Sequence, residues 1–227
     1  MTDFMRKFVH KVDVTSVRAV TYAAIFTFVT AILTIVAFST PNWLVADNRQ
    51  PIKRFEKLGL WEACFYTFRD VNYLYDREFR GCKWLFDEDY AFLLDFLEPP
   101  FFIATQVLYT IGFIFLLVAC IGVLAIQLCF VIDREIFAMK VLSITMFLAA
   151  LFTTIAVLIF GIRGDDRDWM PDHDHNFLSW SYGLAVVGVF FEWMSAILFW
   201  AESRILYKKE LKREQQMFNM EPTNIKA

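Results

Sequence analysis

The chain has 227 residues, of which 58% are hydrophobic and 26 are phenylalanine, so an ordinary soluble domain is excluded. The formal net charge of −3 gives no indication of nucleic-acid binding. Apolar residues are gathered into long runs instead of being spread along the chain, which is typical of a membrane protein.

Four apolar runs are long enough to cross a bilayer, whose hydrocarbon core of roughly 30 Å needs about 20 helical residues. Backbone polar groups find no water in that core, so each run is expected to be a helix. The first run is too long for a secretory signal core and predicts an uncleaved span. The predicted spans are residues 19–39, 99–132, 141–162 and 177–201.

The connecting segments carry charges of opposite sign. Residues 1–18 hold four basic and two acidic residues, and residues 202–227 hold six and four. Residues 40–98 hold eight basic and eleven acidic residues, and residues 163–176 hold two and five. A basic excess marks the cytoplasmic side. Both termini and the turn 133–140 are therefore expected inside, with the two acidic loops outside.

The first outer loop, residues 40–98, has the pattern of a β unit. Strands are expected at Trp43–Ala46, Leu58–Tyr66 and Phe79–Phe86, because β-branched and aromatic residues lie there between turn formers. Glycine at position 59 predicts a bend or bulge in the second strand. Apolar residues then recur at helical spacing, which predicts a short helix over residues 87–97.

Within this loop, Trp43 precedes Gly59-Leu60-Trp61, and Cys64 and Cys82 follow. That order resembles the claudin superfamily, which includes peripheral myelin proteins, epithelial membrane proteins and calcium-channel gamma subunits. The resemblance implies a left-handed bundle of four transmembrane helices capped by a small extracellular antiparallel β-sheet. It also implies a Cys64–Cys82 disulfide, which agrees with the oxidising side of the membrane.

The spacing of these cysteines departs from the vertebrate claudin pattern. Seventeen residues separate Cys64 from Cys82, more than vertebrate claudins commonly have, and the added length is rich in aromatic residues. Enlarged loops of this kind are similar to those of invertebrate septate-junction claudins. The motif tryptophans, Trp43 and Trp61, are expected to anchor the sheet at the outer membrane surface. Contact with a neighbouring protomer is the alternative.

The acidic run Asp87-Glu88-Asp89 follows the second cysteine closely. Asp87 can serve as an N-cap, and the other carboxylates suit the first turn of the helix that it begins. In claudin-like proteins the sheet lines the paracellular path. The same carboxylates, placed along such a path, would favour cations over anions.

Two residues inside or near the spans carry other chemistry. Cys129 lies near the inner face, where palmitoylation and inert packing are both open. Glu192 is the charge within the fourth run, and a carboxylate there is usually paired. Gln106 and a tyrosine on a neighbouring helix are the partners considered.

No catalytic, cofactor or metal site is expected. The chain has no His-Glu-x-x-His motif, phosphate-binding glycine loop or nucleophile elbow. Residues 172–175 (Asp-His-Asp-His) have the right types for a metal, but adjacent ligands on a loop rarely define one geometry.

The resemblance implies a multi-pass plasma-membrane protein of lateral cell–cell junctions, tight or septate. Its protomers would meet identical or related claudin-like protomers in the same and the facing membrane, with lipids around the helices, and would form a paracellular barrier. The alternative is an auxiliary gamma-type subunit of an ion channel or receptor. A cytosolic scaffold is left open, because Ile225 and Ala227 make a weak PDZ ligand.

Overall fold

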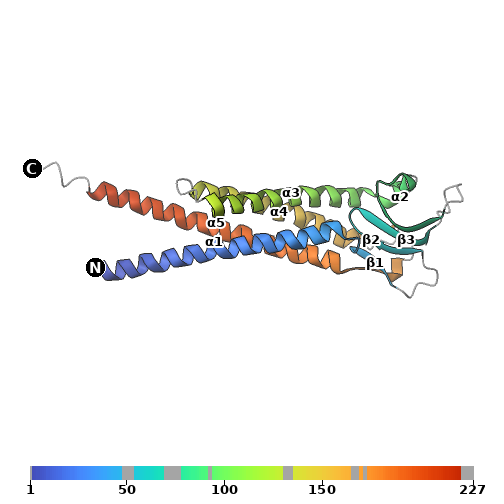
Figure 1. Ribbon diagram of the computed structural model, residues 1–227, viewed down its shortest axis with the longest axis horizontal. Coiled ribbons are helices and arrows are strands. Elements are labelled where there is room, and N and C mark those ends of the chain that lie inside the picture. Colours follow the sequence, from blue (N-terminus) through green and yellow to red (C-terminus); the bar gives the residue numbers. More distant parts are fainter. Residues whose placement is uncertain are drawn as a thin grey trace, which may run out of the picture.

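The computed structural model is an elongated bundle of helices with a β-sheet at one end and both chain termini at the other (Figure 1). It describes residues 2–47, 54–68, 78–91, 94–129, 135–164, 169–170 and 173–220, and in the first helix it describes side chains from residue 19 onward.

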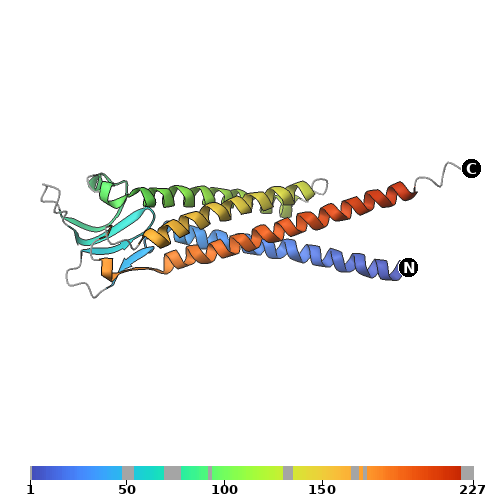
Figure 2. The same cartoon turned by 180° about the vertical axis from the view of Figure 1, so that it is seen from behind.

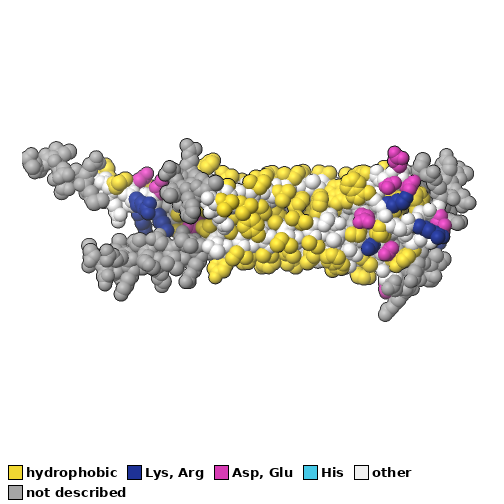
Figure 3. Space-filling model, viewed as in Figure 1, with side chains coloured by type: hydrophobic (Ala, Val, Ile, Leu, Met, Phe, Trp, Pro, Cys, Tyr) yellow, Lys and Arg dark blue, Asp and Glu magenta, His cyan; other side chains and the backbone are white. Residues whose placement is uncertain are grey.

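Four long helices form the bundle and confirm the predicted membrane fold. They are α1 (Thr2–Ser39), α3 (Pro100–Cys129), α4 (Glu135–Arg163) and α5 (Trp180–Met220). Each holds a segment long and apolar enough to cross a membrane: Ala19–Ser39, Pro100–Leu128, Ile136–Arg163 and Trp180–Phe218. The middle of the molecule is covered by hydrophobic side chains, and charged side chains gather at the two ends (Figure 3).

Two helices differ in extent from the predicted spans. α1 continues toward the N-terminus to Thr2, and α5 continues past residue 201 to Met220. The added part of α5 is rich in Lys, Arg, Glu and Gln, which are good helix formers without being apolar. The start of α5 is three residues later than predicted, because residues 176–178 form a strand. Seen from behind, α1 and α5 diverge toward the termini (Figure 2).

Small and hydroxyl side chains bring the helices together inside the bundle. α1 packs along α5, and α4 packs against both α3 and α5. The Thr27 and Ser195 hydroxyls are 2.6 Å apart, and Thr30 Oγ1 donates to the Gly188 carbonyl at 3.2 Å. Close approach through small residues and interhelical hydrogen bonds replaces the hydrophobic effect, which does not drive helices together in lipid.

A five-stranded antiparallel sheet caps the bundle. Its spatial order is β4 (Phe79–Trp84), β3 (Glu62–Phe68), β2 (Phe55–Leu58), β1 (Leu44–Ala46) and β5 (Asn176–Leu178). The single strand predicted at Leu58–Tyr66 is wrong, because Gly59-Leu60-Trp61 turns the chain and separates β2 from β3. β5 comes from the second outer loop and pairs with β1.

The helix predicted over residues 87–97 corresponds to two short helical stretches, and residues 92 and 93 lie outside the described residues. A 3₁₀ turn covers Glu88–Tyr90, and the short helix α2 covers Leu94–Leu97. The Tyr90 side chain is buried, and its hydroxyl donates to the Ala63 carbonyl at 3.1 Å. This hydrogen bond joins the 3₁₀ turn to the beginning of β3.

Candidate functional site

The disulfide predicted between Cys64 and Cys82 is confirmed. The two cysteines face each other across β3 and β4, so the bond staples neighbouring strands. The Glu62 carboxylate lies within 4.8 Å of both sulfur atoms, a grouping with the residue types of a metal site. Disulfide sulfurs have no thiolate to offer, so this group does not make a zinc-type site.

Trp43 fixes the sheet to the tops of the helices. Its indole N–H donates to the Ala37 carbonyl at 2.7 Å, and its ring makes edge contacts with Tyr109, Phe160 and Tyr182. The side chain is fully buried inside the protein. Trp43 therefore anchors the sheet to the helix ends, which enclose its ring; its depth relative to the outer membrane surface stays a prediction.

The turn Gly59-Leu60-Trp61 is held from two sides. A Cβ added to Gly59 would lie 2.5 Å from Pro41 Cα and 2.7 Å from the Thr40 carbonyl oxygen, so only glycine fits against that backbone. The Leu60 carbonyl accepts a hydrogen bond of 2.7 Å from Gln106 Nε2 of α3. The Gln106 side chain therefore hydrogen-bonds to the turn. The glycine is needed because the backbone of the turn lies against the backbone of Thr40 and Pro41, and not because it forms a bulge.

Trp61 differs from Trp43 in being half-buried. Its ring packs against Phe38 of α1 and Phe86, with ring centroids 5.3 and 6.2 Å away. Its buried indole N–H has no hydrogen-bond partner among the described residues. Trp61 therefore lies where the sheet meets the end of the first helix.

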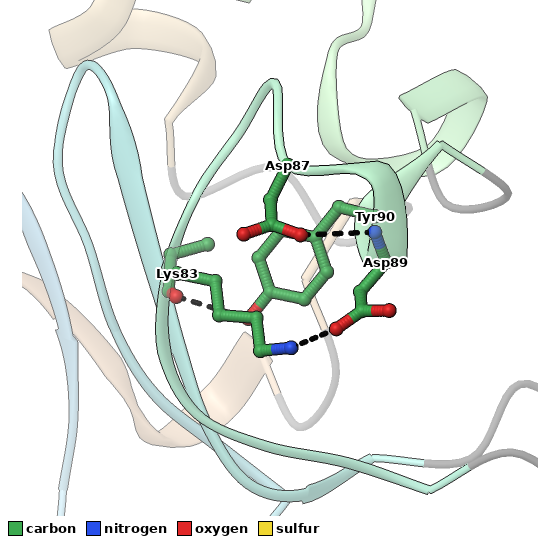
Figure 4. Close-up of polar contacts among 5 residues, drawn as sticks. Lys83, Asp87, Asp89 and Tyr90 are labelled. Atoms are coloured by element: carbon green, nitrogen blue, oxygen red, sulfur yellow. Dashed lines mark hydrogen bonds and ion pairs between the residues drawn. The ribbon is translucent and has the colours of Figure 1, made fainter.

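The acidic run has a local structural role (Figure 4). Asp87 caps the 3₁₀ turn, and its Oδ1 accepts the Asp89 backbone N–H at 3.0 Å. Asp89 forms an ion pair with Lys83 of β4, and this hydrogen bond raises the pKa of Lys83. Burial, followed by nearby carboxylates, raises the pKa of Tyr90 to about 12. Glu88 is exposed.

Glu192 is buried in the bundle, and its Oε2 accepts a hydrogen bond from Thr153 of α4. Its Oε1 has no partner in the described part of the chain. Neither partner considered from the sequence makes this bond, since Gln106 donates to Leu60.

Other predicted residues lie apart from the sheet. Cys129 is the last residue of α3, and its side chain lies outside those that the structure describes. Residue 172 of the Asp-His-Asp-His run is also outside them, whereas the His175 carbonyl accepts the Asp47 N–H at 2.6 Å. Trp169 of the second loop is buried, and its N–H donates to the Phe96 carbonyl at 3.1 Å.

Comparison with known proteins identifies one family. A family model described as PMP-22/EMP/MP20/Claudin tight junction matches residues 28–201. The match begins within α1 and ends within α5, so it includes α3, α4 and the whole sheet, together with part of the first and of the last apolar segment. Among curated proteins, no sequence matches the chain.

Proposed function

Because the chain belongs to the PMP-22/EMP/MP20/claudin family, we propose that it is a claudin-like cell–cell junction protein. Protomers associate side by side in one membrane and meet those of the facing cell through their outer loops, which limits diffusion between cells. The observation that carries the proposal is the disulfide-stapled sheet that projects beyond the four apolar segments (Figure 1).

A barrier element must keep its shape when it is pressed against a neighbour. The sheet meets this need because Trp43 and Gln106 join it to the helix ends through buried hydrogen bonds. Exposed apolar side chains on the sheet, Tyr66, Trp84 and Phe177, are the candidates for contact with other protomers. Trp169 is excluded from that role by its burial.

The orientation in the membrane is part of the same proposal. α1 begins and α5 ends opposite the sheet (Figure 1), and four basic residues follow the predicted span 177–201 within α5: Lys208, Lys209, Lys212 and Arg213. A basic excess beside a span favours the cytoplasmic side. In the orientation that we propose, the sheet lies outside the cell, where a disulfide is stable.

Mixed cell cultures test the adhesion step. Non-adherent cells that express the full chain with a fluorescent label are mixed with cells that express it with a second label and with unlabelled cells. We expect enrichment at contacts between two expressing cells, and none at contacts with unlabelled cells. Because related claudins can supply the facing protomer, the test is repeated with a claudin-like protein in the second cell.

The gamma-type subunit predicts a different result. An auxiliary subunit uses its outer loops and helix faces to hold a larger channel or receptor, so it spreads evenly over the cell surface. Even distribution in both cultures, together with stoichiometric co-purification of a channel from native tissue, would replace the junction proposal with this alternative.

A further inference from the structure

A groove of about 490 Å³ lies where the sheet meets the outer ends of two helices. Its walls come from segments far apart in the sequence. α1 contributes Phe38 and α3 contributes Thr110, while the β2–β3 turn, β3, β4 and the loop after β4 contribute Trp61, Glu62, Trp84 and Phe86. The groove opens at the edge of the apolar segments that cross the membrane.

Aromatic rings of different orientation surround this groove. Trp84 and Phe86 have centroids 6.0 Å apart and planes inclined by 88°. Trp61 and Phe86 are inclined by 38°, and Trp61 and Phe38 by 57°. Trp84 and Phe86 are both more than half exposed, so their faces are open to a ligand.

One carboxylate stands among the rings. Glu62 is directly opposite Trp84 across β3 and β4, which places both side chains on the same face of the sheet. Glu62 forms no ion pair with any residue that the structure describes. The groove therefore combines negative charge with aromatic faces.

We propose that this groove binds the choline headgroup of a membrane phospholipid. Aromatic cages recognise quaternary ammonium ions through attraction to the ring faces. The Glu62 carboxylate complements the same positive charge. A primary ammonium, as in ethanolamine lipids, is more strongly hydrated and has N–H donors that aromatic walls do not satisfy.

The helix surfaces below the groove suit the acyl chains of such a lipid. Ile35 lies one turn inward from Ser39 on α1, and Ile114 and Leu117 lie one and two turns inward from Thr110 on α3. Residues three or four apart share a helix face, and these three apolar side chains are exposed. The acyl chains of a lipid whose headgroup lies in the groove would therefore lie along these apolar side chains, at the depth of the hydrocarbon core.

Native mass spectrometry of the purified full chain tests the proposal. Delipidated protein in detergent receives equal amounts of dioleoyl phosphatidylcholine and dioleoyl phosphatidylethanolamine. We expect about tenfold more bound phosphatidylcholine. Trp84→Leu should reduce this preference to near equality. Glu62→Gln should weaken the binding of both lipids, because the carboxylate attracts either ammonium group, whereas Glu62→Asp should keep most of the binding and the preference. The matched controls Glu88→Gln and Trp180→Leu change exposed residues outside the groove and should keep the full preference.

Equal binding of the two lipids to the unaltered protein would overturn the proposal, as would a preference that Trp84→Leu retains. Displacement of phosphatidylcholine by a sterol at equal concentration would also overturn it, since a sterol has no ammonium group. Thermal unfolding in the same detergent shows whether each variant is folded. If a variant is not folded, the comparison of the two lipids on the unaltered protein still decides whether the groove prefers choline.

Discussion

The close approach of Gly59 to the Thr40–Pro41 backbone gives the sharpest test of how the sheet packs against the helix ends. Replacing Gly59 with alanine adds a Cβ that lies 2.5 Å from Pro41 Cα, 2.7 Å from the Thr40 oxygen and 3.1 Å from the Pro41 nitrogen. Ordinary carbon contacts are about 3.5–4.0 Å, so the turn must move by roughly 1 Å. All three neighbours are backbone atoms, and the proline ring restricts their adjustment.

The expected cost follows from overpacking in a well-packed site, about 1–3 kcal/mol, and we expect Gly59→Ala at the upper end, about 3 kcal/mol. The matched control is Gly183→Ala in α5. No atom lies within 4 Å of the Cβ added there, so this change should be neutral or stabilise the helix by up to about 1 kcal/mol. Unfolding by SDS titration in mixed micelles measures both free energies.

A second change identifies the cause of the loss. Gln106→Leu should cost about 1–3 kcal/mol by leaving the Leu60 carbonyl unpaired. In the Gly59→Ala background, where the turn has already moved from α3, the same change should cost clearly less. Gly59→Ala within about 0.5 kcal/mol of the unaltered protein would refute the steric argument. If the losses from Gly59→Ala and Gln106→Leu are fully additive, the turn still contacts α3 in the Gly59→Ala protein.

Three further outcomes are expected. Cys64→Ser should cost about 3 kcal/mol and reduce delivery to the cell surface, measured by surface biotinylation; intact-mass analysis that finds both thiols free in the unaltered protein would contradict the disulfide. Tyr90 stabilises the fold while neutral, and its folded pKa of about 12 exceeds the ordinary 10, so the stability it contributes should fall as pH rises from about 10 to 12. Tyr90→Phe should weaken this alkaline loss in SDS titrations. Neutralising Asp87, Glu88 and Asp89 together should lower sodium-over-chloride permeability across a monolayer if they line a path, whereas unchanged selectivity at normal surface expression favours capping.

Hydropathy and a short motif were enough to predict the bundle and the stapled sheet. The spans follow from composition alone, because lipid excludes unpaired backbone groups. The bend predicted at Gly59 is a full turn between β2 and β3. Its extent was not predicted because apolar and β-forming residues continue on both sides of Gly59, and nothing local marks the approach of Pro41. β5 was missed because its three residues are specified by pairing with β1, more than a hundred positions earlier.

The sites show the same division between local and distant causes. The capping role of Asp87 depends on its immediate neighbours and was predicted. The partner of Glu192 and the burial of Trp43 depend on which helix faces meet, and hydropathy does not separate a lipid-facing ring from an enclosed one. The groove depends on Phe38 and Trp84 being brought together by the fold, so it has no signature in the sequence.

The junction proposal and the lipid proposal place different demands on one piece of structure. The sheet must be rigid to act as a barrier, and its rigidity comes from buried contacts at the Trp43 end. At the other edge, Trp84 and Phe86 are exposed and rest on α1 and α3 only across the groove. A lipid headgroup that fills this space would support the edge from below. Protomers packed side by side would then meet through an edge whose support comes from the membrane itself. Trp84→Leu should therefore lose both the choline preference and the junctional enrichment, whereas Glu62→Asp should keep both.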